Sequence, residues 1–194
     1  MKIKVKTVSL IVFMFMVFSA GIFFINESNA QSKKYKIGDK GPAGGWIFYD
    51  KGDFKDGWRY LEAAPVDQSK GAEWGCQEKS IPEAKGTDIG TGKSNTQAIV
   101  KNCEEANIAA KLCTTYHGGG KRDWFLPSKK ELNLMHETLN VNGIGGFSIN
   151  DSFLMYWNSS EYSVSDAWCQ LFSYGIGDKQ KKSSSFHVRA IRAF

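Results

Sequence analysis

The sequence has little of what enzymes and metal sites usually depend on. It contains three histidines and four cysteines in 194 residues, and no C-x-x-C pair is present. A zinc site or a thioredoxin-like redox centre therefore has no support. No Cys/His or Ser/His/Asp arrangement stands out, and His136 fits the edge of an apolar helix face better than a catalytic role. We accordingly expect no enzyme, no catalytic residues, no metal and no cofactor.

A strong charge of either sign is also absent. Residues 31–194 carry 22 basic and 19 acidic side chains, a net charge of +3. Such a weak balance does not by itself indicate nucleic acid or a membrane surface as the partner. Because the N-terminal residues also indicate export, as described next, we expect no nucleic-acid binding.

The first thirty residues have the pattern of a targeting segment. Three lysines in the first six residues precede an apolar run at 8–25, and small residues lead up to Ala30. We expect a signal peptide at 1–30, cleaved after Ala30. The alternative is an uncleaved anchor, because the run approaches the roughly 20 residues that span a bilayer. No cysteine follows the run closely, so a lipid anchor is not expected.

This segment sets the expected location and domain limits. We predict a secreted, periplasmic or cell-surface protein with a polar tether at 31–36 and one domain at 37–194. Any membrane contact would run through an uncleaved signal segment.

An even cysteine count in an exported chain indicates disulfides. Four cysteines allow three pairings. We expect Cys76 to pair with Cys103, which would close a glycine-rich loop, and Cys113 to pair with Cys169.

The best-marked local element is a helix start at residues 127–131. Ser128 and Glu131 have capping-box spacing, in which each side chain accepts a hydrogen bond from the other residue's backbone N–H. An apolar stripe follows at helical spacing, made by Leu132, Met135, His136 and Leu139. This stripe needs a sheet to cover it, because a helix of about three turns does not persist alone in water.

The remaining segments alternate between strand-like, loop-like and helical patterns. We expect a hairpin from 46–49 and 58–61, a long loop at 64–94 in which Trp74 either plugs the core or is exposed for stacking, and a helical region at 94–116. That region opens with a second capping-box spacing, at Ser94 and Gln97, and Asn102 and Asn107 are places where it could divide. Strands are expected at 154–158, 167–173 and 186–193. Grouped strands without β-α-β alternation favour an α+β fold.

Six separated phrases together carry a family resemblance. They are G-D-K-G-P-A-G-G at 38–45, G-W-R-Y-L-E-A-A-P at 57–65, G-T-G-K-S-N-T-Q-A-I-V at 90–100, D-W-F-L-P-S-K-K-E-L-N-L-M at 123–135, Y-W-N-S-S-E-Y at 156–162 and V-R-A-I-R-A-F at 188–194. In this order the chain resembles the Lcl C-terminal domain family over nearly all of residues 35–194.

The resemblance implies a C-type-lectin-like fold, with small antiparallel sheets flanked by two helices and long disulfide-stapled loops. It also implies binding of sulfated polysaccharide in attachment, as associated with the adhesin that gave the family its name. One departure is the absence of a collagen-like repeat, so trimerisation through a triple helix is not expected. The lectin-like superfamily includes oxidases that use a close cysteine pair, but Cys169 has no such neighbour in sequence.

The segment Y-W-N-S-S-E-Y supplies the first candidate binding residues. Trp157 offers a ring on which a sugar can stack, and Asn158 and Glu161 offer partners for hydroxyls. The competing interpretation is that these side chains lock the strand to the long loop through buried hydrogen bonds. No Glu-Pro-Asn motif is present, so calcium-dependent sugar binding is not supported.

Basic residues near the C-terminus supply the second candidate set. Lys179, Lys181 and Lys182, with Arg189 beyond them, would attract a sulfated or other anionic glycan. The alternative is a solvated hairpin tip. We therefore predict an exported, non-enzymatic recognition domain for glycan or anionic polysaccharide; the alternative is a structural or protein-binding module of the cell envelope.

Overall fold

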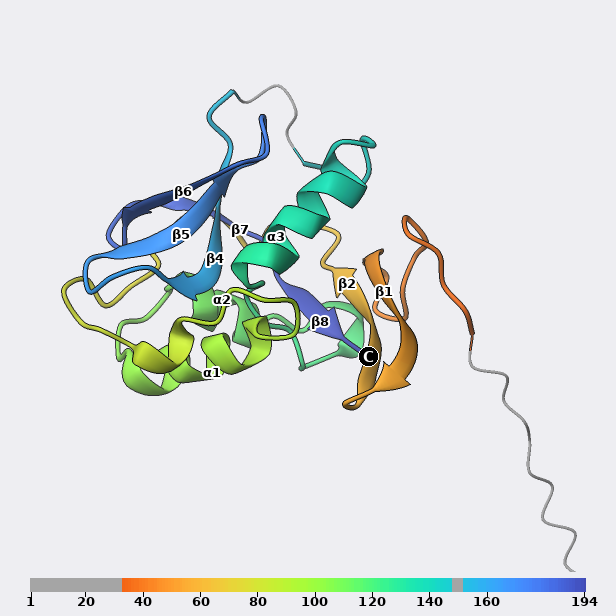
Figure 1. The fold of residues 1–194 in the computed structure, drawn as a ribbon, viewed down its shortest axis with the longest axis horizontal. Helices are drawn as coiled ribbons and strands as arrows, with labels where there is room; N and C mark the ends of the chain where they lie inside the picture. The colour runs from red at the N-terminus through yellow and green to blue at the C-terminus, as the bar shows by residue number, and fades with distance from the viewer. Residues whose placement is uncertain (1–32, 148–151) are drawn as a thin grey trace, which may run out of the picture. The chain divides into compact units, whose positions relative to one another are not determined.

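The computed structural model describes residues 33–147 and 152–194 (Figure 1). The expected signal peptide at 1–30 and the first two residues of the tether lie outside these ranges. Residues 34–194 form one unit with its own internal contacts. In the part of the chain that is described, no helix has the length and apolar character needed to span a membrane.

The first sheet joins the start of the domain to its end. Its strands, in the order β1-β2-β8, are β1 (Trp46–Lys55), β2 (Trp58–Ala63) and β8 (Ile191–Ala193), all antiparallel. The predicted hairpin is confirmed, but its loop is shorter than expected. Asp56 and Gly57 have φ of 56° and 82° and form a two-residue turn between Lys55 and Trp58. Asp-Gly favours this turn because both positions need positive φ.

The second sheet is larger and mixed. In spatial order its strands are β3 (Ser69–Ala72), β7 (Phe186–Val188), β4 (Met155–Glu161), β5 (Asp166–Leu171) and β6 (Ile176–Lys181). The expectation of purely antiparallel sheets was wrong at one place, because β4 and β7 run parallel. The predicted strand at 186–193 is divided between the two sheets at Arg189 and Ala190. The edge strand β6 was not predicted, since its residues are mostly polar and exposed.

Three α-helices are present in residues 33–147 and 152–194: α1 (Gly92–Asn102), α2 (Ala109–Thr115) and α3 (Lys129–Met135). The predicted helical region does divide, between Asn102 and Ala109. Its predicted cap was wrong: α1 begins two residues before Ser94, whose hydroxyl donates a hydrogen bond to the Thr91 carbonyl oxygen (2.9 Å). Gly92 is required at this start, since an added Cβ would lie 2.2 Å from a carboxylate oxygen of Glu131.

The capping box of α3 is confirmed. The Ser128 hydroxyl accepts from the Glu131 backbone N–H (3.3 Å), and the Glu131 carboxylate accepts from the Ser128 N–H (2.6 Å). After Met135 the helix continues as a π-helical turn, η3 (His136–Asn140). Figure 1 shows α3 between the two sheets, and it contacts β1, β4 and β5.

The core has two parts. The first, which contains Trp157, Cys169 and Val188 of the larger sheet, packs against α1, α2 and Trp74. The second, which contains Tyr156, packs against the apolar face of α3 and the smaller sheet. Trp74 is fully buried, so of the two interpretations of this side chain the core plug is correct.

One of the two expected disulfides is present. Cys76 and Cys103 are bonded and link the long loop to the end of α1, as predicted. The expected bond between Cys113 and Cys169 was wrong, because both cysteines are free. Each is buried as a small apolar side chain in the first part of the core, and burial raises the pKa of both thiols, to about 12 for Cys169.

Candidate functional site

The predicted sugar-stacking residue Trp157 lies in the core. It is fully buried, and its indole N–H donates to the Ala72 carbonyl oxygen (2.9 Å). The indole N–H of Trp74 in turn donates to the Asn158 carbonyl oxygen (2.9 Å). These bonds tie β4 to the long loop, so the ring of Trp157 is not available to a sugar and the locking interpretation is correct for it.

Glu161 and Lys182 form a second part of this lock. Their side chains are fully buried, with Lys182 Nζ 2.7 Å from Glu161 Oε1. The same carboxylate oxygen accepts from the Ile81 backbone N–H (2.7 Å), and Lys182 Nζ also donates to the Lys79 carbonyl oxygen (2.7 Å). The prediction that these two residues contact a ligand at the surface is therefore wrong, because the two buried charges pair with each other and with backbone groups of the long loop.

Arg189 is also internal. Its Nε donates to Asp67 (2.6 Å), and its Nη1 donates to the carbonyl oxygens of Ala64 (3.1 Å) and Gly145 (2.8 Å). The side chain is 1% exposed. The prediction that Arg189 binds an anion is therefore wrong: at the point where the chain passes from one sheet to the other, its side chain joins the loop at 64–68 to the loop that contains Gly145.

Lys179 and Lys181 are the predicted basic residues that do lie at the surface. They stand on edge strand β6, opposite Trp168 and Asp166 of β5. Lys179 Nζ donates to the Tyr162 hydroxyl (2.9 Å), and this bond raises the pKa of Lys179. Lys181 Nζ lies 3.7 Å from Asp166. Both ammonium groups remain open to solvent.

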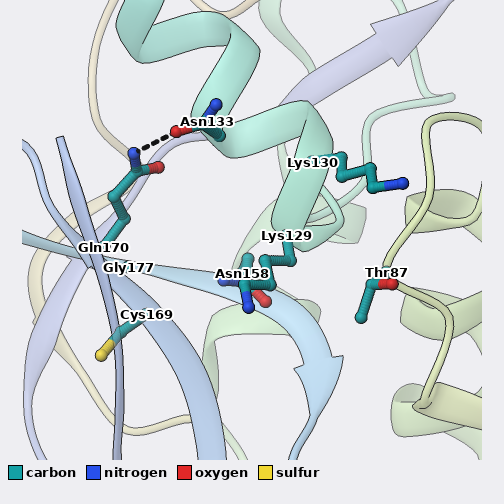
Figure 2. Close-up of a pocket in the computed structure, with 8 residues that line it drawn as sticks. All are labelled: Thr87, Lys129, Lys130, Asn133, Asn158, Cys169, Gln170 and Gly177. Atoms are coloured by element: carbon teal, nitrogen blue, oxygen red, sulfur yellow. Dashed lines mark hydrogen bonds between the residues drawn. The ribbon is translucent and has the colours of Figure 1, made fainter.

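A cavity of about 430 Å³ adjoins this strand (Figure 2). It is lined by Lys129, Lys130 and Asn133 from α3 and by Asn158, Gln170 and Gly177 from the larger sheet. Thr87 contributes from the loop before α1, while the Cys169 thiol points away from the helix in Figure 2. Three carboxamides and two ammonium groups make this lining rich in hydrogen-bond donors.

Lys129 is the unusual cation of the cavity. Its Nζ lies 3.2 Å from the centroid of the Trp168 ring. Burial lowers the pKa of Lys129. Among the ion pairs of residues 33–147 and 152–194, none includes Lys129, whereas its neighbour Lys130 pairs with Asp88. Lys129 is therefore a partly desolvated cation whose countercharge is not supplied by the described part of the protein.

Of the predicted ligand-binding residues, Asn158 is the one that lines the cavity. Its Oδ1 accepts from the Ser160 backbone N–H (3.0 Å), which fixes the orientation of the carboxamide. Its Nδ2 is buried and has no hydrogen-bond partner in the described structure. A buried donor without a partner costs roughly 1–3 kcal/mol, so an acceptor entering the cavity would recover free energy there.

The site differs from the predicted one because its residues come from distant segments. Lys129 and Trp168 were not among the predicted binding residues. The alternation of Trp168 and Gln170 along a strand places both on one face, which was a signal available in the sequence. We call the surface formed by Lys129, Tyr162, Trp168, Lys179 and Lys181 the lysine–aromatic face.

The described residues offer little for a metal. The cluster with suitable spacing is Cys76, Cys103 and Glu105. Its two sulfur atoms are joined in the disulfide, so they are not available as thiolate ligands.

Comparisons with known proteins identify a family and a solved structure of related fold. A family model described as the Lcl C-terminal domain matches residues 64–192. No curated protein matches. Among solved structures the chain is similar to a fimbrial protein from Bacteroides ovatus ATCC 8483, with a TM-score of 0.52 and 13% identity. The similarity covers 79% of this chain and 45% of that protein, so the chain spans less than half of its length, and at this identity the likeness is one of fold alone.

Proposed function

Because this chain belongs to the Lcl C-terminal domain family, we propose that it is an exported, non-enzymatic recognition module that binds acidic polysaccharide at a bacterial cell surface. The resemblance of its six phrases to this family supports the ligand class. The fold shared with a fimbrial protein supports a surface or adhesion role. We propose in addition that the fold is C-type-lectin-like, which is supported by the pairing of the first hairpin with the last strand.

The observation that carries the proposal is the lysine–aromatic face. Trp168 lies directly opposite Lys179 in the sheet register, and Asp166 lies opposite Lys181, so these side chains share one face of the sheet. Lys129 reaches the same face from α3, and the rings of Tyr162 and Trp168 are 5.1 Å apart. Cations beside half-exposed rings suit a sugar polymer, since the rings pack against sugar C–H groups and the cations attract sulfate or carboxylate.

A heparin column tests the proposal. We expect the purified protein to be retained and to elute with salt, because attraction between exposed charges is screened. The variant Lys179→Gln/Lys181→Gln should elute at lower salt, with each lost cation weakening binding about two- to fivefold. The control Lys101→Gln, at an exposed position of α1, should elute like the parent protein. Equal elution of all three proteins would refute the proposed face.

The second candidate is a protein-binding module, and one feature favours it. β6 is an edge strand of the sheet, and Ile176 at its start and Tyr174 just before it are 58% and 66% exposed. The free edge of β6 could form backbone hydrogen bonds with a strand of another protein chain. A protein partner held in this way should remain bound at moderate salt in a pulldown from envelope extract, whereas polysaccharide binding should fall.

A further inference from the structure

We infer that the cavity between α3 and the larger sheet is a subsite for a single acidic sugar residue, whose oxyanion is held by Asn158 Nδ2 and Lys129 Nζ. The inference rests on the proposed function and deepens it. The lysine–aromatic face would attract a polymer by charge, whereas the cavity would recognise one unit of that polymer by its shape and its anionic group.

Asn158 supplies the first reason. The residue is fully buried, and its carboxamide cannot turn over without giving up the hydrogen bond that Oδ1 accepts from Ser160. Nδ2 is therefore held as a donor in the wall of the cavity, with no acceptor among the residues the structure describes. A donor fixed in this way selects a ligand that brings an acceptor.

Lys129 supplies the second reason, from a different element. Its ammonium group lies against Trp168 and is partly removed from water, and no described carboxylate is within ion-pair distance. Water stabilises this ammonium group less well than one at the surface, and a sulfate or carboxylate beside it would compensate by supplying a countercharge. Together the two donors favour an oxyanion over a neutral hydroxyl.

The rest of the lining is ordered before any ligand arrives. Gln170 Nε2 donates to Asn133 Oδ1 (2.8 Å), the bond drawn in Figure 2, and also to the Gly175 carbonyl oxygen (3.1 Å). These bonds join α3 to the sheet and hold two carboxamides in place for sugar hydroxyls. The volume of about 430 Å³ lies in the range of small-molecule sites, which suits one sugar residue.

Gly177 provides a steric test of the cavity that leaves its polar groups unchanged. An added Cβ would meet only Lys129 Cε, at 3.8 Å, which is ordinary contact, and the backbone there does not have positive φ. Gly177→Val should therefore fold normally and fill part of the cavity. Lys129→Gln removes the cation, and Asn158→Asp keeps the acceptor for Ser160 while it replaces the unpaired donor with an oxygen.

The experiment is a calorimetric titration of the purified protein with glucuronic acid, N-acetylglucosamine 6-sulfate and glucose. We expect one or both acidic sugars to bind and glucose to bind at least about tenfold more weakly. Binding by glucuronic acid alone would assign the oxyanion as a carboxylate, and binding by the sulfated sugar alone would assign it as a sulfate. Lys129→Gln and Gly177→Val should each weaken the acidic sugar at least about tenfold, and Lys101→Gln should leave it unchanged.

Two results would overturn the subsite. The first is equal binding of acidic sugars and glucose, or no binding of any. The second is parental affinity in both Lys129→Gln and Gly177→Val. Circular dichroism of each variant separates loss of binding from loss of fold. Because heparin retention is measured independently, a protein that is retained on heparin but binds no single sugar refutes the subsite alone, and the reverse result refutes the proposed polymer binding alone.

Discussion

The buried pair of Glu161 and Lys182 makes the strongest prediction about stability. Its charges are 2.7 Å apart with both side chains fully buried, and the carboxylate also accepts from the Ile81 N–H. Lys182→Met keeps an unbranched side chain of similar size but removes the cation. The carboxylate is then left in the core without its countercharge.

The size of the effect follows from that geometry. Removing one partner of a buried ion pair costs roughly 3–5 kcal/mol, because the remaining charge stays desolvated. With an m-value of about 2 kcal/mol per M urea, a loss of about 4 kcal/mol moves the unfolding midpoint down by about 2 M. The double variant Glu161→Gln/Lys182→Met should recover part of this loss, since Gln keeps an acceptor for Ile81 but carries no charge.

Urea unfolding followed by tryptophan fluorescence measures the change. The matched control is Lys181→Met, one residue away but exposed and 3.7 Å from Asp166, which should change stability by about 0.5 kcal/mol or less. Equal midpoints for Lys182→Met and Lys181→Met would refute the assignment of Lys182 to the lock. A double variant no more stable than Lys182→Met would show that the loss does not come from the uncompensated charge.

Three further predictions concern other parts of the fold. Cys113 and Cys169 should not react with a thiol reagent in the native protein, because both are buried and burial raises the pKa of both thiols. After unfolding without reductant the reagent should label two thiols, and rapid labelling of the native protein would contradict the prediction. Burial alone raises the pKa of Asp123, but the hydrogen bonds and charge of Arg192 outweigh it and hold that pKa below its ordinary value. The stability that this pair contributes is thus fully present above the unfolded pKa of about 4 and is lost as the pH falls through the lower folded pKa. Between pH 6 and pH 2 the free energy of unfolding of Asp123→Asn should therefore fall less than that of the parent protein. The same fall in both proteins would argue against the pair. Ser128→Ala should lower the free energy of unfolding by about 1–2 kcal/mol, because the hydroxyl caps α3 and also donates to the Asp88 carbonyl oxygen (2.8 Å), and a urea midpoint like that of the parent would contradict the role of the cap.

The features that could be predicted from the sequence are mainly local. The capping box needs only Ser128 and Glu131 at the right spacing, and the apolar stripe after it follows from helical period. The Cys76–Cys103 bond followed from an exported pattern and a loop in need of closure. In each case the neighbouring residues contain the whole physical reason.

The features that could not be predicted depend on packing between distant segments. Lys181 and Lys182 are adjacent and identical in type, yet one is exposed and the other is fully buried, because only Lys182 reaches the Glu161 carboxylate under the long loop. Trp157 has the composition of a sugar platform, but the loop that carries Trp74 covers it. Strand β6 lacks apolar alternation because, as an edge strand, it is exposed along most of its length.

The cavity is the feature that was hardest to predict from the sequence. Lys129 and Asn158 are separated by a helix and a loop, and their shared lining exists only once α3 lies on the sheet. No sequence pattern indicates that a particular donor lacks a hydrogen-bond partner, so the unpaired Nδ2 of Asn158 could be found only from the structure.

The most direct test of acidic-glycan recognition is a nuclear magnetic resonance titration of the isotopically labelled protein with a heparin-derived tetrasaccharide. We predict that the largest shifts occur at the indole N–H of Trp168, the side-chain amide of Asn158 and the backbone of Lys129 and Lys179. The indole N–H of Trp58, on the other sheet, should not shift. Shifts that are absent, or that are spread evenly over both sheets, would contradict binding at this face.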